Sequence, residues 1–108
     1  MAKYTLIASR DPFESKEAAH YFDLAGDLKT QGNEVTLFLV QNGVFAARKS
    51  TASSTVTGLA AQGVTVLVDN FSLRERGIPG DRLADKVQPS DLDVVVDHMA
   101  DGRRVIWH

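Results

Sequence analysis

Residues 64–78 read V-T-V-L-V-D-N-F-S-L-R-E-R-G-I, and this stretch changes from a strand pattern to a helix pattern. Residues 64–68 are all β-branched or leucine, which is typical of a buried strand. Asp69 or Asn70 can then cap a helix over residues 71–76, and Gly77 can end that helix. A strand that leads directly into a helix predicts one unit of a parallel sheet.

The same alternation of strand and helix extends in both directions along the chain. Residues 34–40 are almost continuously apolar, which indicates a strand covered on both faces. Further strands are expected over residues 4–8, near Val87 and over residues 104–107. We therefore predict an α/β fold for residues 1–108: one domain, a three-layer α/β/α sandwich with a mainly parallel sheet of about five strands.

Helix boundaries are predicted from capping patterns. The first helix starts either at Asp11, with Pro12 at its first position, or at Ser15, and it ends near Gly32. Ser90 and Asp93 have the spacing of a capping box at the start of a helix over residues 91–100. The apolar stripe of this helix consists of Leu92, Val95, Val96 and Met99. Shorter helices are expected over residues 44–48 and 55–62, joined by a polar loop over residues 49–54.

Composition excludes several classes of function. The 108 residues carry 12 Lys and Arg against 14 Asp and Glu, a net charge of −2, so we expect no nucleic-acid partner. The chain has no cysteine, which excludes disulfides, cysteine-ligated metals and a thiol nucleophile. No apolar run approaches the ~18 residues of a membrane span, and the first residues do not resemble a signal peptide. We therefore expect a cytoplasmic protein without membrane contact.

Polar side chains follow three of the predicted strands at the points where the strands end. Because the carboxyl ends of parallel strands meet at one edge of a sheet, ligands bind in the crevice at that edge. The ligand-binding residues predicted there are Ser9, Arg10, Gln41, Asn42, Asp69, Asn70 and Ser72. Asn42 and Asp69 are also natural helix caps, a role that needs no ligand.

No pattern in the sequence indicates a metal, a cofactor or a catalytic group. His20 has the helical spacing of a metal pair with Asp23, as has His98 with Asp101, but zinc needs a third or fourth protein ligand. Glycine-rich nucleotide-binding motifs and the serine-hydrolase motif are absent from the sequence. We therefore predict no metal site, no cofactor and no catalytic residue.

Three stretches of the sequence resemble the DsrE/DsrF-like sulfur-relay family. They are the first strand and the helix with Ala18, Ala19 and Phe22, the L-F-L-V-Q-N-G-V of residues 37–44, and residues 64–78 quoted above. The resemblance implies a small α/β protein that assembles into homo- or hetero-oligomers. It also implies a persulfide-carrying cysteine in the turn after the third strand, where this chain has Asp69 and Ser72. Neither side chain can hold a sulfane sulfur, because that chemistry needs a thiolate.

These observations favour an oligomeric binding or scaffold module that performs no covalent sulfur transfer. One alternative is a protein or enzyme that binds an anionic or nucleotide-like ligand through Asn42 and Asp69. Another is an accessory subunit that docks a cysteine-bearing sulfurtransferase. Trp107 either completes the sheet or packs against a second subunit, and Phe13, Phe45 and Phe71 can form an aromatic rim for a protein contact.

Overall fold

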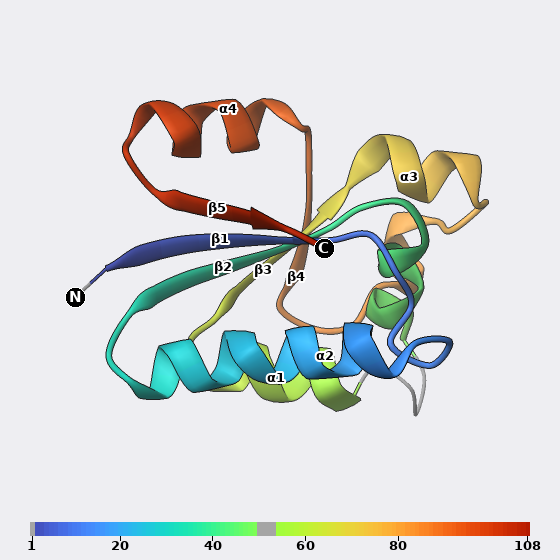
Figure 1. Ribbon diagram of the computed structural model, residues 1–108. Helices are drawn as coiled ribbons and strands as arrows, with labels where there is room; N and C mark the ends of the chain where they lie inside the picture. The colour runs from blue at the N-terminus through green and yellow to red at the C-terminus, as the bar shows by residue number, and fades with distance from the viewer. Residues whose placement is uncertain (1, 50–53) are drawn as a thin grey trace.

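Five strands form one parallel sheet in the order β4-β3-β2-β1-β5, as the computed structural model shows for residues 2–49 and 54–108 (Figure 1). The strands are β1 (Lys3–Ala8), β2 (Glu34–Leu39), β3 (Thr65–Asp69), β4 (Val87–Ser90) and β5 (Arg104–Trp107). β1 is paired on both sides, with β2 and with β5. Most of the polar loop predicted over residues 49–54 lies outside the described residues.

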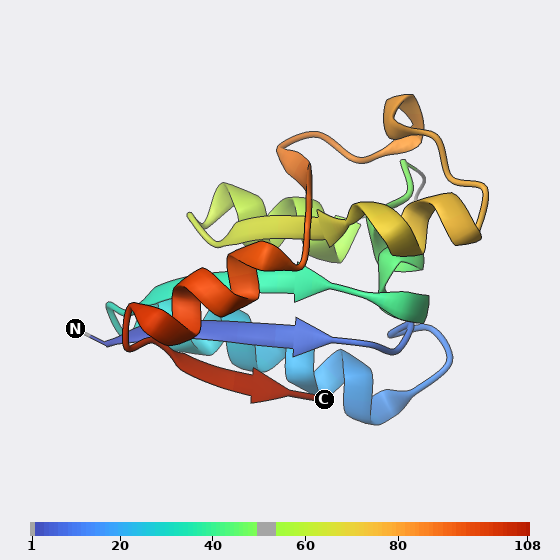
Figure 2. The ribbon, with the colours of Figure 1, turned by 90° about the horizontal axis from the view of Figure 1, so that it is seen from above.

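Helices cover both faces of the sheet (Figures 1 and 2). The helices α1 (Lys16–Thr30) and α2 (Ser54–Ala61) lie on one face, and α4 (Asp93–Ala100) lies on the other. The short helix α3 (Asn70–Glu75) and the 3₁₀ segments η1 (Gln41–Ala47) and η3 (Gly80–Arg82) lie beyond the carboxyl ends of the strands. The predicted three-layer α/β/α sandwich is thus confirmed. Among the described residues, none of the helices has the length and apolar character needed to cross a membrane.

The two faces of the sheet carry unequal cores. Alternate strand residues point to opposite faces, so Leu6 and Leu37 join the large cluster under α1 and α2, whereas Phe38 joins the small cluster under α4. The buried residues of that small cluster are Ile7, Phe38, Val40, Leu67 and Val95. The α4 face of the sheet is therefore the more thinly covered one.

The capping predictions have different outcomes at the two helices. The Ser15 side chain caps α1 by accepting a hydrogen bond from the amide of Ala18 at 3.2 Å, so the second of the two predicted starts is confirmed. Asp11 lies in the preceding loop and accepts from the amide of Phe13 at 3.0 Å. The capping box at Ser90 is wrong, because Ser90 pairs with Asp69 as the last residue of β4 and α4 begins at Asp93 without a side-chain cap.

The apolar stripe of α4 is only partly buried. Val95 packs against the sheet, whereas Leu92, Val96 and Met99 are about half or more exposed. Val94 and His98 also face the sheet, so the buried side of α4 includes Val95 at one edge of the stripe and leaves the other three residues outward. Trp107 completes the sheet through its backbone, which pairs with Ile7, while its side chain remains 62% exposed.

Candidate functional site

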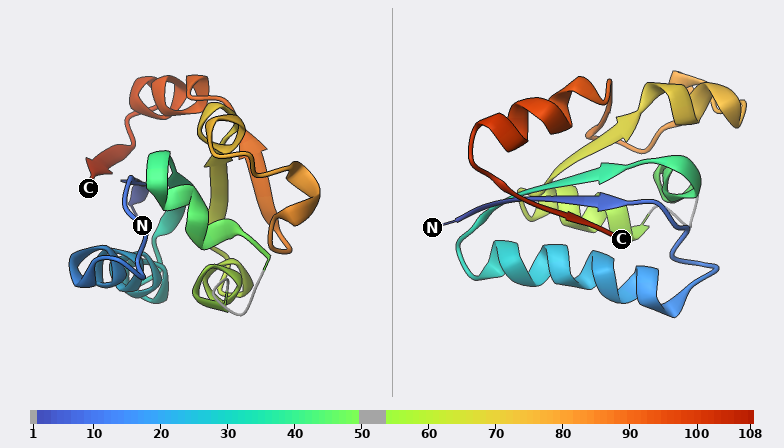
Figure 3. Two further views of the ribbon diagram at one scale, coloured as in Figure 1. Left: turned by 90° about the vertical axis from the view of Figure 1, so that its right-hand side faces the viewer. Right: turned by 45° about the horizontal axis from the view of Figure 1, so that its top comes forward.

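The carboxyl edge of the sheet collects the loops in which we predicted a site. All strand pairs are parallel, so every strand ends at this edge, which faces the viewer in the left view of Figure 3. Ser9 follows β1, Gln41 begins η1 after Val40, and Asn70 begins α3 directly after β3. These loops therefore lie together at one edge of the sheet, as predicted.

A buried hydrogen-bond network joins Asp69, Ser72 and Gln41. Oδ2 of Asp69 accepts from the amide of Ser72 at 3.1 Å and from its hydroxyl at 2.7 Å, which caps α3. The Ser72 oxygen in turn accepts from the amide of Gln41 at 2.8 Å. Asp69 is 4% exposed and Ser72 is 3% exposed, so the network holds η1 and α3 together away from solvent.

The turn between β2 and η1 is strained and closely packed. Gln41 has a φ of 49°, in the left-handed region that side chains other than glycine seldom adopt. A Cβ atom on Gly43 would lie 2.2 Å from the backbone oxygen of Ala8, so only glycine fits there. The end of β1 and the start of η1 are thus fixed against each other at the candidate site.

The remaining predicted site residues make separate local contacts. Oδ1 of Asn42 accepts from Arg76 at 3.0 and 3.1 Å, and Nδ2 of Asn70 donates to Asp91 at 3.1 Å. The Ser9 hydroxyl donates to the backbone oxygen of His108 at 2.8 Å, and Arg10 is exposed in the loop after β1. Of the seven predicted site residues, the structure therefore joins Gln41, Asp69 and Ser72 in one network, and the other four lie outside it.

A small cavity of about 180 Å³ opens at this network, and we call it the edge cavity. Its lining consists of Val40, Gln41, Asp69, Phe71, Ser72, Glu75, Leu92 and Trp107. Asp69 and Glu75 are its charged residues, so the lining favours a neutral or cationic group over an anion. Glu75 and Leu92 were not predicted as site residues, because they reach the cavity from the end of α3 and from the start of α4, which are not adjacent in sequence. Phe71 and Trp107 had been singled out only as aromatic side chains near strand ends.

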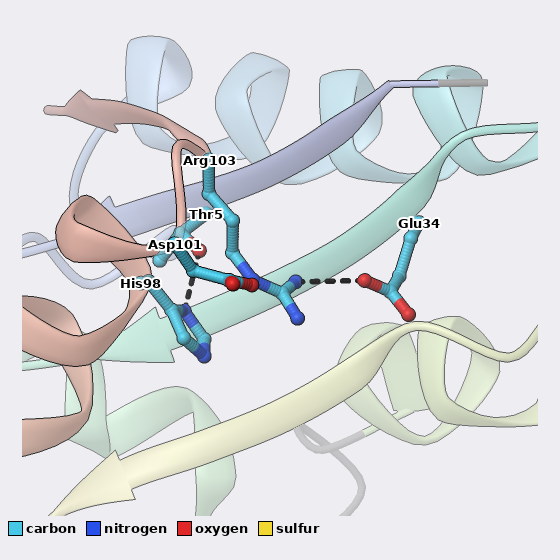
Figure 4. Close-up of polar contacts among 5 residues, drawn as sticks. All are labelled: Thr5, Glu34, His98, Asp101 and Arg103. Carbon is cyan, nitrogen blue, oxygen red and sulfur yellow. Dashed lines mark hydrogen bonds and ion pairs between the residues drawn. The ribbon is translucent and has the colours of Figure 1, made fainter.

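A second polar cluster lies between α4 and the sheet (Figure 4). Nδ1 of His98 lies 2.7 Å from the hydroxyl of Thr5, and Nη1 of Arg103 lies 2.9 Å from Oε2 of Glu34. Asp101 faces Arg103 at 3.7 Å. Desolvation and the Arg103 charge lower the pKa of His98, against the opposing effect of Asp101. His98 and Asp101 thus have separate partners, and the described residues contain no group of three or more His, Asp or Glu side chains placed to hold a metal ion.

Comparison with protein families and solved structures places the fold. The model of the DsrE/DsrF-like family matches residues 2–108, whereas no curated protein matches the chain. The ychN protein of E. coli is 23% identical, with a TM-score of 0.88 and complete coverage of both chains. Protein MTH1491 of Methanobacterium thermoautotrophicum, described as of unknown function, is 22% identical with a TM-score of 0.81, again over both complete chains.

Protein BT1422 of Bacteroides thetaiotaomicron, also described as of unknown function, is 12% identical. The match covers 98% of this chain and 94% of that one with a TM-score of 0.80. These likenesses show the same fold, a five-stranded parallel sheet between helices. Because the family model spans residues 2–108, the chain belongs to the DsrE/DsrF-like family.

Proposed function

We propose that this protein is a cytoplasmic, oligomeric binding or scaffold module of its family that performs no covalent sulfur transfer. One observation carries the proposal: none of the 108 residues is a cysteine. Sulfur relay passes a sulfane sulfur through a persulfide, which forms only on a thiolate. The chain therefore has the fold of the sulfur-relay family without the group that its chemistry requires.

The turn after β3 supports this proposal. The resemblance drawn from the sequence puts the persulfide-bearing turn of the family there, and in this chain the turn has Asp69 and Ser72. Both side chains are buried, and the Ser72 hydroxyl donates a hydrogen bond to Oδ2 of Asp69 at 2.7 Å. Their contacts fix α3 and η1 in place, which is a structural task rather than a nucleophilic one.

An exposed apolar surface supports the oligomer. We call it the α4–β5 face, and it consists of Leu92, Val96, Met99 and Trp107. These residues are between 49% and 64% exposed, and they belong to the thinly covered side of the sheet, where Trp107 pairs with Ile7 of the small cluster. Exposed apolar side chains that gather on one side mark a protein contact, so we infer that a second copy of the chain packs against this face.

The chemical part of the proposal is tested with a persulfide donor. After incubation with the donor and removal of excess reagent, we expect the intact mass of the protein to be unchanged. A variant with Phe71→Cys provides the matched control, because Phe71 follows β3 in the same segment and is 58% exposed, so its thiol is open to the donor and shows that the assay detects sulfur. A stable gain of one sulfur atom by the unaltered protein would contradict the proposal.

The edge cavity favours a second candidate function, the binding of a small molecule at the carboxyl edge. Its volume of about 180 Å³ and its lining by Phe71 and Trp107 suit a small apolar group, and its two carboxylates suit a cationic one. Native mass spectrometry of freshly purified protein tests this function, because it detects any small molecule that the protein retains.

The same spectrum tests the other alternative, an accessory subunit for a cysteine-bearing sulfurtransferase. Such a subunit is expected to retain a protein partner, which the spectrum detects by its mass.

A further inference from the structure

A larger cavity, separate from the edge cavity, lies between the end of η1, the turn after α3, and η3. Its volume is about 580 Å³, within the usual range for small-molecule sites. Phe45, Arg48 and Lys49 line it from the end of η1, residues 76–79 line it after α3, and Arg82 closes it from η3. It shares no lining residue with the edge cavity, so it stands independently of the function proposed for that site.

The lining of this cavity is strongly basic. Three arginines and one lysine face it, and no carboxylate is among the described residues that line it. The whole chain has a net charge of −2, so the cluster does not simply reflect a basic protein. Within the described part of the chain, Arg76 and Arg82 take part in no ion pair with a carboxylate. Their charges are therefore available to an anionic ligand.

Contacts with neutral groups hold Arg76 in place. Its Nε and Nη2 atoms donate to Oδ1 of Asn42 at 3.1 and 3.0 Å, and its Nη1 atom donates to the backbone oxygen of Ser72 at 3.4 Å. Its guanidinium also lies 6.0 Å from the centre of the Phe45 ring, and that of Arg48 lies 4.8 Å from the same centre. The contacts of Arg76 orient its positive charge without neutralising it, which reduces the entropy lost on binding.

Backbone contacts also join the two sides of the cavity, which are distant in sequence. The amide of Lys49 donates to the oxygen of Arg82 at 2.6 Å, and the amide of Ala84 donates to the oxygen of Ala47 at 2.8 Å. Arg48 and Leu83 form an antiparallel bridge between these hydrogen bonds. The basic side chains at the end of η1 and at η3 therefore belong to two segments that are hydrogen-bonded to each other.

We propose that this basic cavity binds a small molecule through a tetrahedral oxyanion, a phosphate or sulfate group. The arginine guanidinium groups offer the paired donors that such oxyanions accept. Phe45, Ile78 and Pro79 supply an apolar wall for the remainder of the ligand. Anionic ligands thus bind here rather than at the edge cavity, whose charged residues are acidic.

Calorimetric titration of the protein with inorganic phosphate and, separately, with sulfate tests this proposal. At about pH 8 both ions are dianions, so a difference between them reports the preferred oxyanion rather than the charge. Arg82→Gln is the decisive variant, because Arg82 is exposed and its removal leaves the Asn42 contact intact. Arg76→Gln is the second variant. Arg74→Gln is the matched control, because Arg74 is exposed on α3 and does not line the cavity.

We expect saturable binding of at least one ion, weakened about tenfold by Arg82→Gln and by Arg76→Gln and unchanged by Arg74→Gln. Melting curves of all three variants establish that each is folded. Tighter binding of phosphate identifies a phosphorylated ligand, and tighter binding of sulfate identifies a sulfur oxyanion. The proposal is overturned if neither ion binds at millimolar concentration, or if Arg74→Gln weakens binding as much as Arg82→Gln.

Discussion

Asp69 is the residue on which the local structure of the candidate site depends. It is buried and accepts two hydrogen bonds from Ser72, so Asp69→Ala leaves the Ser72 amide and hydroxyl without their partner. We expect this change to lower the free energy of unfolding by about 1–3 kcal/mol. Asp69→Ser retains a capping oxygen and should cost less than the alanine variant. Urea unfolding of both variants measures the difference, and equal losses would contradict the role of Asp69 as a cap.

His98 should make the stability depend on pH. Burial and Arg103 lower its pKa in the folded protein below the ordinary 6.5, so the unfolded chain binds the proton more readily. The contribution of neutral His98 to the free energy of unfolding is therefore fully present above about pH 6.5. It is lost as the pH falls through the lowered pKa of His98 in the folded protein. We expect His98→Gln to reduce this loss relative to the unaltered protein. Unfolding measured between about pH 5 and pH 8 tests it, and identical pH dependence in both proteins would contradict it.

Sequence reasoning identified the residues of the Asp69 network but not their contacts. The strand-to-helix pattern indicated Asp69 as a cap and placed Gln41 at the same edge, and the structure joins both through Ser72. Asn42 was expected beside Asp69, but its side-chain oxygen accepts hydrogen bonds from Arg76 instead. The direction of a side chain at a strand end depends on the following turn, and the positive φ of Gln41 was not visible in the pattern.

At the scale of elements, Gly43 sets how closely η1 packs against β1. A methyl group there would meet the backbone oxygen of Ala8 at 2.2 Å, and backbone cannot move aside as a flexible side chain can. We expect Gly43→Ala to lower the free energy of unfolding by about 1–3 kcal/mol or more. Gly58→Ala is the control, because Gly58 lies in α2 with open space around it and alanine favours helix. Equal stability of the Gly43→Ala variant and the unaltered protein would contradict this packing.

The order and type of the main elements could be predicted because each depends on local patterns. The start of α4 could not, since the spacing of Ser90 and Asp93 does not reveal that β4 extends to Ser90 by pairing with β3. The outward face of α4 was missed for a similar reason. A stripe of four apolar residues does not show which of them meet the sheet, and only Val95 does so.

At the scale of the whole molecule, the sheet and its layers followed from the sequence, whereas the basic cavity did not. Arg48 lies far along the chain from Arg76 and Arg82, and the three arginines belong to three different segments. They meet because the end of η1 pairs with the segment after η3. No sequence motif predicts this contact. The edge cavity was partly predictable, since fold class alone determines where parallel strands end.

The most direct test of the proposed oligomer is the molar mass in solution, measured by light scattering over a range of protein concentrations. The protein should have a mass that is a multiple of the 11.8 kDa chain. Val96→Glu puts a charge on the α4–β5 face and should give the mass of one chain, because burying an unpaired carboxylate is costly. Leu24→Glu, on the opposite helical layer at α1, should retain the oligomer. A mass of 11.8 kDa for the unaltered protein at every concentration, or an unchanged oligomer in Val96→Glu, would contradict the proposed assembly.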